Sequence, residues 1–104
     1  MLVTLYGDAK KAQSGREGFY ILQTDCVDKK PCWYQENGEN SGSVIWKKDG
    51  LWIIGPKKYL GSKKGQIYSP DDVENPLQAL TWKYWSGNDR IKSKEILVTR
   101  PGNI

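Results

Sequence analysis

Hydrophobic and polar positions along this chain alternate over short runs, and no segment has a sustained helical repeat. The runs are rich in aromatic and β-branched side chains and are bounded by Gly, Pro, Asn, Asp or Ser, which is typical of strands separated by turns. The pattern predicts strands at residues 18–24, 32–35, 43–47, 51–55, 65–69, 80–85 and 91–99, with residues 2–6 as an eighth.

The stretch SVIWKKDGLWIIG contains the clearest turn in the sequence. Its centre is Asp49-Gly50, a pair that accepts the two positive φ angles of a type I′ turn, so the arms on either side are expected to form a hairpin. Alternation places Trp46 on the face opposite Ile45, and Trp52 on the same face as Ile54. Both faces of the hairpin are apolar, which predicts a central position or a sheet curled on itself.

The same alternation assigns faces in the run LTWKYW. Leu80, Trp82 and Tyr84 fall on one face, which we expect to point into the core. Trp85 falls on the other face and is expected outside the core or at its rim. Trp82 is therefore predicted to be structural and Trp85 to be available for contact.

The connections between these runs carry turn residues. Residues 70–75 form the only helical turn that we expect, capped by Ser69 and stopped by Pro76. Residues 85–90 predict a looser turn, and residues 37–42 predict an exposed loop.

Length and composition indicate one domain with an aromatic core. A chain of 104 residues fits one domain, and its five Trp and six Tyr against one Phe and one Met must supply much of the core volume. We assign residues 1–17 to a lead-in segment, 18–99 to the domain and 100–104 to a tail. The fold class expected is all-β: six to eight short, mainly antiparallel strands in a small barrel or sandwich.

The net charge of +4 is a mild excess that favours weak attraction to anions. Cys26 and Cys32 are the only cysteines, and there is no His, so a four-ligand zinc site cannot be completed; no metal and no cofactor are expected. A disulfide would need a tight turn between the two cysteines. With no signal peptide and no apolar run long enough to span a membrane, we expect reduced thiols, no membrane partner and an intracellular location, unless the domain comes from a larger secreted protein.

The sequence contains few residue patterns that would indicate catalysis. The lack of His excludes Ser-His and Cys-His arrangements. Paired carboxylates could serve a hydrolase, but the candidates fall in predicted loops, where solvated surface charge explains them; they are Glu36, Glu39, Asp49, Asp71 and Asp72. We therefore predict a protein that is not an enzyme.

Binding is the function class that remains. Trp46, Trp52 and Trp82 are expected in the core, so a ligand must use rings on loops, beside cationic side chains. The candidate site residues are Trp85, Tyr59, Tyr68, Lys57, Lys58, Lys63 and Lys64. This set suits a partly apolar, partly anionic protein or glycan ligand. The alternatives are nucleic acid or another polyanion bound through the lysine pairs, and carbohydrate stacked on exposed Trp and Tyr. The sequence leaves the oligomeric state open.

Six segments, taken in order, resemble a known kind of module. GFYIL, DKKPCWY, SVIWKKDGLWIIG, YLGSKKGQIYS, NPLQALTWKYWSGND and IKSKEILV are similar to a Trp-rich β module that occurs, often in several copies, in larger eukaryotic proteins. The resemblance spans about residues 18–98, with DKKP in place of the module's Asn-Gly-Lys-Pro turn. It implies a non-catalytic module and no particular activity.

Overall fold

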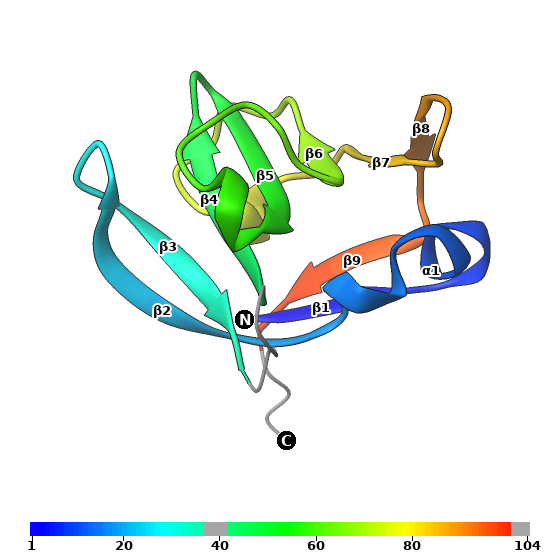
Figure 1. The fold of residues 1–104 in the computed structure, drawn as a ribbon, viewed down its shortest axis with the longest axis horizontal. Helices are drawn as coiled ribbons and strands as arrows, with labels where there is room; N and C mark the ends of the chain where they lie inside the picture. The colour runs from blue at the N-terminus through cyan, green and yellow to red at the C-terminus, as the bar shows by residue number, and fades with distance from the viewer. Residues whose placement is uncertain (37–41, 101–104) are drawn as a thin grey trace.

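The structure is a computed structural model that describes residues 1–36 and 42–100, and it shows one antiparallel sheet of nine strands curled into a nearly closed barrel (Figure 1). The prediction of an all-β fold is confirmed. The number of strands is nine, which corrects the six to eight expected. Residues 37–41 of the predicted 37–42 loop lie outside the described residues.

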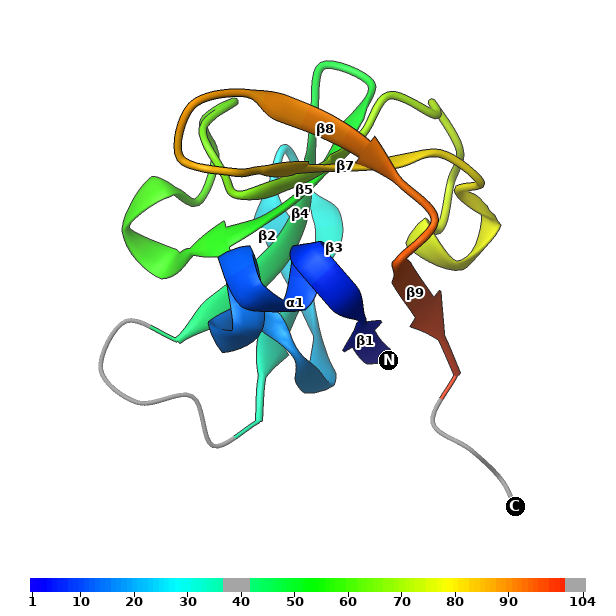
Figure 2. The ribbon, with the colours of Figure 1, turned by 90° about the vertical axis from the view of Figure 1, so that its right-hand side faces the viewer.

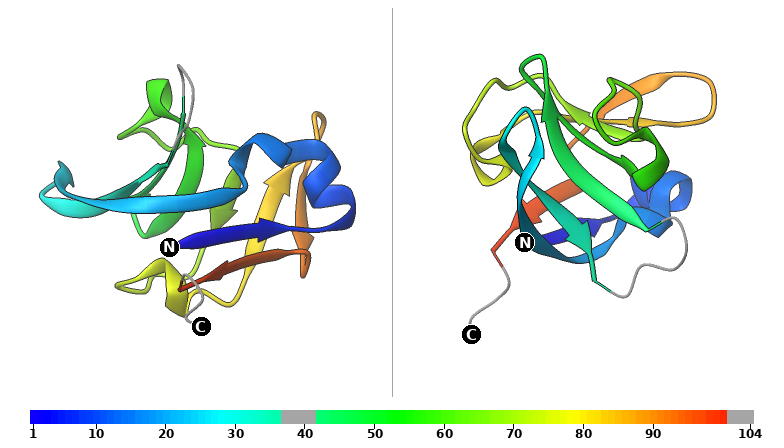
Figure 3. Two further views of the ribbon diagram at one scale, coloured as in Figure 1. Left: turned by 90° about the horizontal axis from the view of Figure 1, so that it is seen from below. Right: turned by 60° about the vertical axis from the view of Figure 1, so that its left-hand side comes forward.

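Strands that are neighbours in the sheet are also consecutive in the sequence, with a single exception. Their order is β8-β7-β6-β5-β4-β3-β2-β1-β9, so only β9 pairs with a strand distant in the sequence (Figure 3). β1 therefore lies inside the sheet, between β2 and β9. The strands are β1 (Leu2–Leu5), β2 (Gly18–Val27), β3 (Lys30–Gln35), β4 (Ser43–Lys48), β5 (Leu51–Pro56), β6 (Ile67–Ser69), β7 (Trp82–Trp85), β8 (Arg90–Ser93) and β9 (Ile96–Thr99).

The ninth strand arises because the predicted strand at 91–99 is broken. A bend at Lys94 and Glu95 separates β8 from β9. The Ser93 hydroxyl accepts a hydrogen bond from the Glu95 backbone N–H (2.9 Å), and the Glu95 carbonyl accepts one from Tyr6 N–H (2.9 Å). The chain thus leaves β7 and crosses to β1, which a continuous strand could not do.

The hairpin at Asp49-Gly50 is confirmed. Lys48 pairs with Leu51 across a two-residue turn, and the φ angles of Asp49 and Gly50 are 50° and 80°. These are the left-handed values that a type I′ turn requires.

Two hydrophobic clusters occupy the two faces of this hairpin. The larger cluster fills the barrel and contains Trp33, Trp52 and Trp82, with the Trp33 and Trp52 rings 5.8 Å apart in an edge-to-face arrangement. The smaller cluster lies on the outer face and consists of Cys32, Val44, Trp46 and Ile53. Trp46 and Trp52 are both buried, as predicted, although on opposite sides of the sheet.

Each of these two indoles also fixes a loop. Trp46 Nε1 donates a hydrogen bond to the Ser62 carbonyl (2.8 Å), and Trp52 Nε1 donates one to the Val73 carbonyl (2.8 Å). A buried indole N–H needs such a partner. The hairpin therefore positions the loops that follow β5 and β6 as well as forming the centre of the core.

A short helix, α1 (Gly7–Gln13), lies in the segment predicted as a lead-in and was not expected from the sequence. Ala9 is fully buried in the main cluster, and Gln13 Nε2 donates a hydrogen bond to the Trp85 carbonyl (2.7 Å). Figure 2 shows α1 below β7 and β8, with the 3-10 turn Ser14–Arg16 leading on to β2. Two helical turns are too short to give a hydrophobic repeat.

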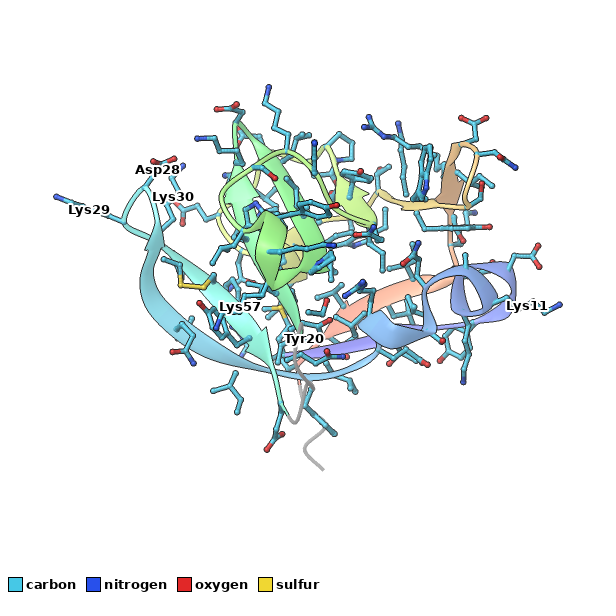
Figure 4. All side chains as sticks on the ribbon, in the orientation of Figure 1. Lys11, Tyr20, Asp28, Lys29, Lys30 and Lys57 are labelled. Atoms are coloured by element: carbon cyan, nitrogen blue, oxygen red, sulfur yellow. A yellow bond between two sulfur atoms is a disulfide. The ribbon has the colours of Figure 1, made fainter. Side chains whose placement is uncertain are left out.

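Cys26 and Cys32 form a disulfide between β2 and β3, with Cα atoms 5.8 Å apart (Figure 4). The expectation of reduced thiols is therefore wrong. The reason is the turn between them: Asp28 and Lys29 have φ angles of 52° and 61°, so β2 turns directly into β3 and brings the two cysteines together.

The helical turn expected at residues 70–75 is absent, and a 3-10 turn forms at Pro76–Gln78 instead. Asn75 caps it, because its Oδ1 accepts a hydrogen bond from Leu77 N–H (2.9 Å) and its own N–H donates to Gln78 Oε1 (3.1 Å). Pro76 therefore begins a helical turn rather than stopping one, as proline does at a first helical position.

Leu80 is 93 % exposed, which corrects its predicted place in the core. The Asp71 carboxylate accepts hydrogen bonds from the backbone N–H groups of Leu80 (2.6 Å) and Thr81 (2.8 Å), so the chain is still outside the sheet here. β7 begins only at Trp82, which is 4 % exposed, as predicted for a core residue.

Candidate functional site

A surface hollow of about 320 Å³ gathers aromatic and cationic side chains from several elements. It lies where β6, β7 and β8 adjoin, at the upper right of Figure 1, beside the loop that leads from β5 to β6. Its lining consists of Tyr59, Lys63, Lys64, Gly65, Gln66, Tyr68, Trp85 and Arg90. Five of the seven residues predicted for the site therefore lie together: Tyr59, Tyr68, Lys63, Lys64 and Trp85.

The loop that forms one wall is held by backbone geometry and by Trp46. Pro56 ends β5, and the 3-10 turn Lys57–Tyr59 follows, with Leu60 N–H donating to the Lys57 carbonyl (3.0 Å). The Ser62 hydroxyl donates to the Tyr59 carbonyl (2.6 Å), while the Ser62 carbonyl accepts from the Trp46 indole (2.8 Å). The loop is therefore anchored to the smaller cluster.

Gly65 lets this loop return to the sheet. A Cβ at this position would lie 2.2 Å from Ile53 Cγ2 and 3.2 Å from the Ile54 carbonyl oxygen. Only a residue without a side chain fits so close to β5. The close approach lets Gln66 N–H donate to the Ile54 carbonyl (2.9 Å), which starts β6 and sets Tyr68 in its place.

Cations lie over the tyrosine rings of the hollow. The Arg90 guanidinium is 4.7 Å from the centre of the Tyr68 ring, and Lys64 Nζ is 5.9 Å from that of Tyr59. Both distances allow cation–π attraction. Lys63 differs from these two because its Nζ is 3.2 Å from Asp49 Oδ2, so part of its charge is neutralised.

The charge of the hollow is positive. Its lining contains three cationic side chains and no carboxylate. Within residues 1–36 and 42–100, neither Lys64 nor Arg90 forms a salt bridge. Trp85 adds an apolar surface, since it is 38 % exposed. An anionic ligand with a flat or apolar face could therefore contact both kinds of side chain at once.

Lys57 and Lys58, the other two residues predicted for the site, do not line the hollow. Lys57 (Figure 4) places its Nζ 5.0 Å from the centre of the Tyr34 ring, over β3. Lys58 Nζ lies 5.2 Å from the centre of the Tyr59 ring. Successive side chains of a 3-10 turn point about 120° apart, so neighbours in the sequence face different ways.

Arg90 and Gln66 line the hollow but were not among the residues predicted for the candidate site. Arg90 is paired with Trp85 across the β7–β8 hairpin, so the predicted turn at 85–90 contained a signal for it. Gln66 had no such signal. Its side-chain Oε1 is buried beside Gly55, without a hydrogen-bond partner in the described part of the chain.

Asp71 and Asp72, two of the carboxylates considered for catalysis, have structural partners, and Glu39 lies outside the described residues. Backbone N–H groups of Thr81 and Leu80 lower the pKa of Asp71, and the hydrogen bond from Lys47 (2.7 Å) lowers that of Asp72. Among residues 1–36 and 42–100, no three His, Cys, Asp or Glu side chains are grouped as a metal site would need. No helix in the same ranges has the length and apolarity to cross a membrane.

We compared the chain with known protein families, with curated proteins and with solved structures, and none of the three comparisons found a match. The resemblance to the Trp-rich β module stays a prediction.

Proposed function

We propose that the chain is a non-catalytic binding module and that its ligand site is the hollow between the 59–66 loop and strands β6 to β8. The observation that supports the proposal is the convergence of three rings and three cations, from separate elements, on one hollow without a carboxylate. Its volume, about 320 Å³, is near the lower end for small-molecule sites. It suits a short ligand segment rather than a long polymer.

The ligand that fits this chemistry has a flat or apolar face joined to a negative group. The exposed Trp85 ring offers the face, and Arg90 and Lys64 offer the charge. An acidic peptide segment with one aromatic residue meets both requirements, since its ring can stack while its carboxylates meet the cations. A substituted glycan is the other ligand with these features.

A nucleic acid fits less well. A continuous basic strip requires the lysine pairs to converge, yet Lys57 lies over Tyr34 and Lys63 is paired with Asp49. The hollow retains two cations without an acidic partner among the described residues, enough to meet one or two negative groups. Binding there should weaken only modestly with added salt, whereas binding to a strand of phosphates weakens steeply.

Amide chemical-shift titration tests the proposal. The probes are an acidic peptide with one central Trp, a sulfated disaccharide and an eight-nucleotide single-stranded DNA. We expect the peptide or the disaccharide to shift amides at residues 63–68 and 85–90. Trp85→Ala and Arg90→Gln should each weaken this binding at least about tenfold, the factor that corresponds to 1.4 kcal/mol.

Lys57→Gln is the matched control, because it removes the same charge from a neighbouring position that does not line the hollow. It should leave binding unchanged. Equal weakening by Lys57→Gln and Arg90→Gln would contradict the proposed site. Preference for the oligonucleotide, with a steep salt dependence, would replace it with nucleic-acid binding.

We further propose that the protein works in an oxidising compartment, rather than at the intracellular location expected from the sequence. The support is the disulfide, because such bonds persist mainly outside the reducing cytosol. Alkylating the protein at the moment of extraction from its natural source, followed by mass spectrometry, should find Cys26 and Cys32 unmodified. Alkylation of both would show that the thiols are reduced in place.

A further inference from the structure

A second, larger surface feature lies at the opening of the barrel. It is a groove of about 590 Å³ whose wall is mostly apolar, lined by Leu80, Thr81, Trp82, Lys92, Ser93, Lys94, Ile96 and Leu97. Figure 2 shows its frame: β8 runs into the bend, β9 descends from the bend, and the segment that leads to β7 lies beside them. The groove shares no residue with the hollow.

β9 has an unpaired edge along this groove. It is the last strand of the sheet, and among the residues that the structure describes β1 is its one neighbour in the sheet. The Glu95 carbonyl faces β1, where it accepts from Tyr6 N–H (2.9 Å). Because the backbone groups of successive residues in a strand face opposite sides, those of Ile96 and Val98 face away from β1. Ile96 is only 4 % exposed as a whole residue, whereas Val98 is half-buried, so an added strand can pair with this edge at the N–H and carbonyl of Val98.

The side chains beside this edge determine which kinds of residue an added strand needs. Leu80 is 93 % exposed and Leu97 is 43 % exposed, so apolar surface lies next to the free backbone groups. Lys92 and Lys94 are also exposed and line the groove, and no carboxylate of residues 1–36 or 42–100 belongs to its lining. Lysines near an edge disfavour unselected strands, but they attract acidic ones.

We propose that the free edge of β9 binds an extended peptide segment of a partner, in which apolar residues alternate with Asp or Glu. Backbone hydrogen bonds to Val98 align the segment as a tenth strand. Its apolar side chains cover Leu80 and Trp82 on one face, because side chains alternate along a strand. Its carboxylates meet Lys92 and Lys94. The proposal does not depend on the function assigned to the hollow.

The probe for a test is an acetylated eight-residue peptide of alternating Val and Glu, titrated into the labelled protein at up to about 1 mM. We expect shifts of the amides at residues 80–82 and 96–99, with no change at residues 63–68. The same peptide methylated on every backbone nitrogen cannot donate hydrogen bonds to the edge. It should bind at least about tenfold more weakly.

A second test of the proposal reverses the charges of the two lysines that line the groove. The double variant Lys92→Glu, Lys94→Glu should lose the Val-Glu peptide and gain a peptide of alternating Val and Lys. The matched control reverses two exposed charges away from the groove, Lys11→Glu with Lys29→Glu (Figure 4). It changes the net charge equally and should leave the preference unchanged. Both variants alter exposed side chains only, and their amide spectra check that they fold.

Three results would overturn the proposal. The first is no shift at residues 96–99 at the highest peptide concentration. The second is equal binding of the methylated and unmethylated peptides, which would mean contact without strand pairing. The third is the same set of shifts on raising the protein concentration without peptide, which would assign the edge to a second copy of the chain.

Discussion

Trp82 and Trp85 lie on the same strand and face opposite sides of it, so truncating each one tests the face assignment of β7 directly. Trp82 is 4 % exposed within the main cluster, while Trp85 is 38 % exposed at the hollow. Both changes are Trp→Ala, in the same strand of the same hairpin. A difference between them therefore measures burial rather than strand propensity.

The expected magnitudes follow from the area each ring buries. A fully buried Trp removes about 150–250 Å² from water, and large-to-small changes of this kind cost about 3–5 kcal/mol once the cavity is included. We expect that loss for Trp82→Ala, which is comparable with the whole stability of a small domain. For Trp85→Ala, about three-fifths of the ring is covered and solvent fills the space, so about 1–2 kcal/mol is expected.

Urea denaturation followed by far-ultraviolet circular dichroism measures both losses, provided that the slope of free energy against urea is unchanged. Trp82→Phe serves as a milder variant if Trp82→Ala does not fold, and it should still lose more stability than Trp85→Phe. Equal losses at the two positions, or a larger loss at Trp85, would mean that β7 presents the other face to the core.

Three further predictions concern the turns, the disulfide and a surface carboxylate. Reducing the Cys26–Cys32 disulfide should lower the free energy of unfolding by about 2 kcal/mol, from the entropy of a seven-residue loop, and urea curves with and without dithiothreitol should differ by that amount. Gly50→Ala should cost about 1–2 kcal/mol in thermal unfolding because Gly50 has a φ of 80°, whereas Gly15→Ala, which meets no atom within 4 Å, should change little. The backbone N–H groups that lower the pKa of Asp71 stabilise the fold above its unfolded pKa of about 4, and this contribution is lost as the pH falls through the lower folded value. Asp71→Asn should therefore make stability less dependent on pH between about 2 and 5, and an unchanged slope would argue against this contribution.

The parts of the fold that the sequence predicted are those with local causes. The Asp49-Gly50 turn needs only its own two residues, and alternation placed Trp46, Trp52 and Trp82 in the core correctly. The break at Glu95 could not be predicted in this way, because it depends on a hydrogen bond to Tyr6 from the far end of the chain.

The disulfide and the helix α1 are two other features that the sequence did not predict. Asp28 and Lys29 both adopt positive φ, yet neither is Gly or Asn, so the tight turn between the cysteines had only a weak signal. The helix Gly7–Gln13 packs Ala9 against the main cluster, and one small residue does not make a hydrophobic repeat.

The sequence predicted several residues that meet at the hollow, but it did not predict the directions that the side chains of the 3-10 turn take. Tyr68 and Trp85 were expected on loops but lie on the adjacent strands β6 and β7, and the sheet brings them near the 59–66 loop. Lys57 lies over Tyr34, away from the hollow, because of the 3-10 turn, whereas Lys58 lies 5.2 Å from the Tyr59 ring without lining the hollow. Arg90 was missed because its neighbour across the hairpin was not considered.

The order of strands has a consequence for how the chain folds. Every pair from β1 to β8 closes a short or moderate loop, such as that between Lys48 and Leu51, whereas β9 pairs Thr99 with Leu2 across nearly the whole chain. Loop-closure entropy makes the pairing of β9 with β1 costlier than the closure of a short loop by about 2–3 kcal/mol. The meander should therefore form first and β9 should dock last, so β9 is also the strand that opens first. Amide hydrogen exchange should then be faster at Leu97, which faces β1, than at Ile45.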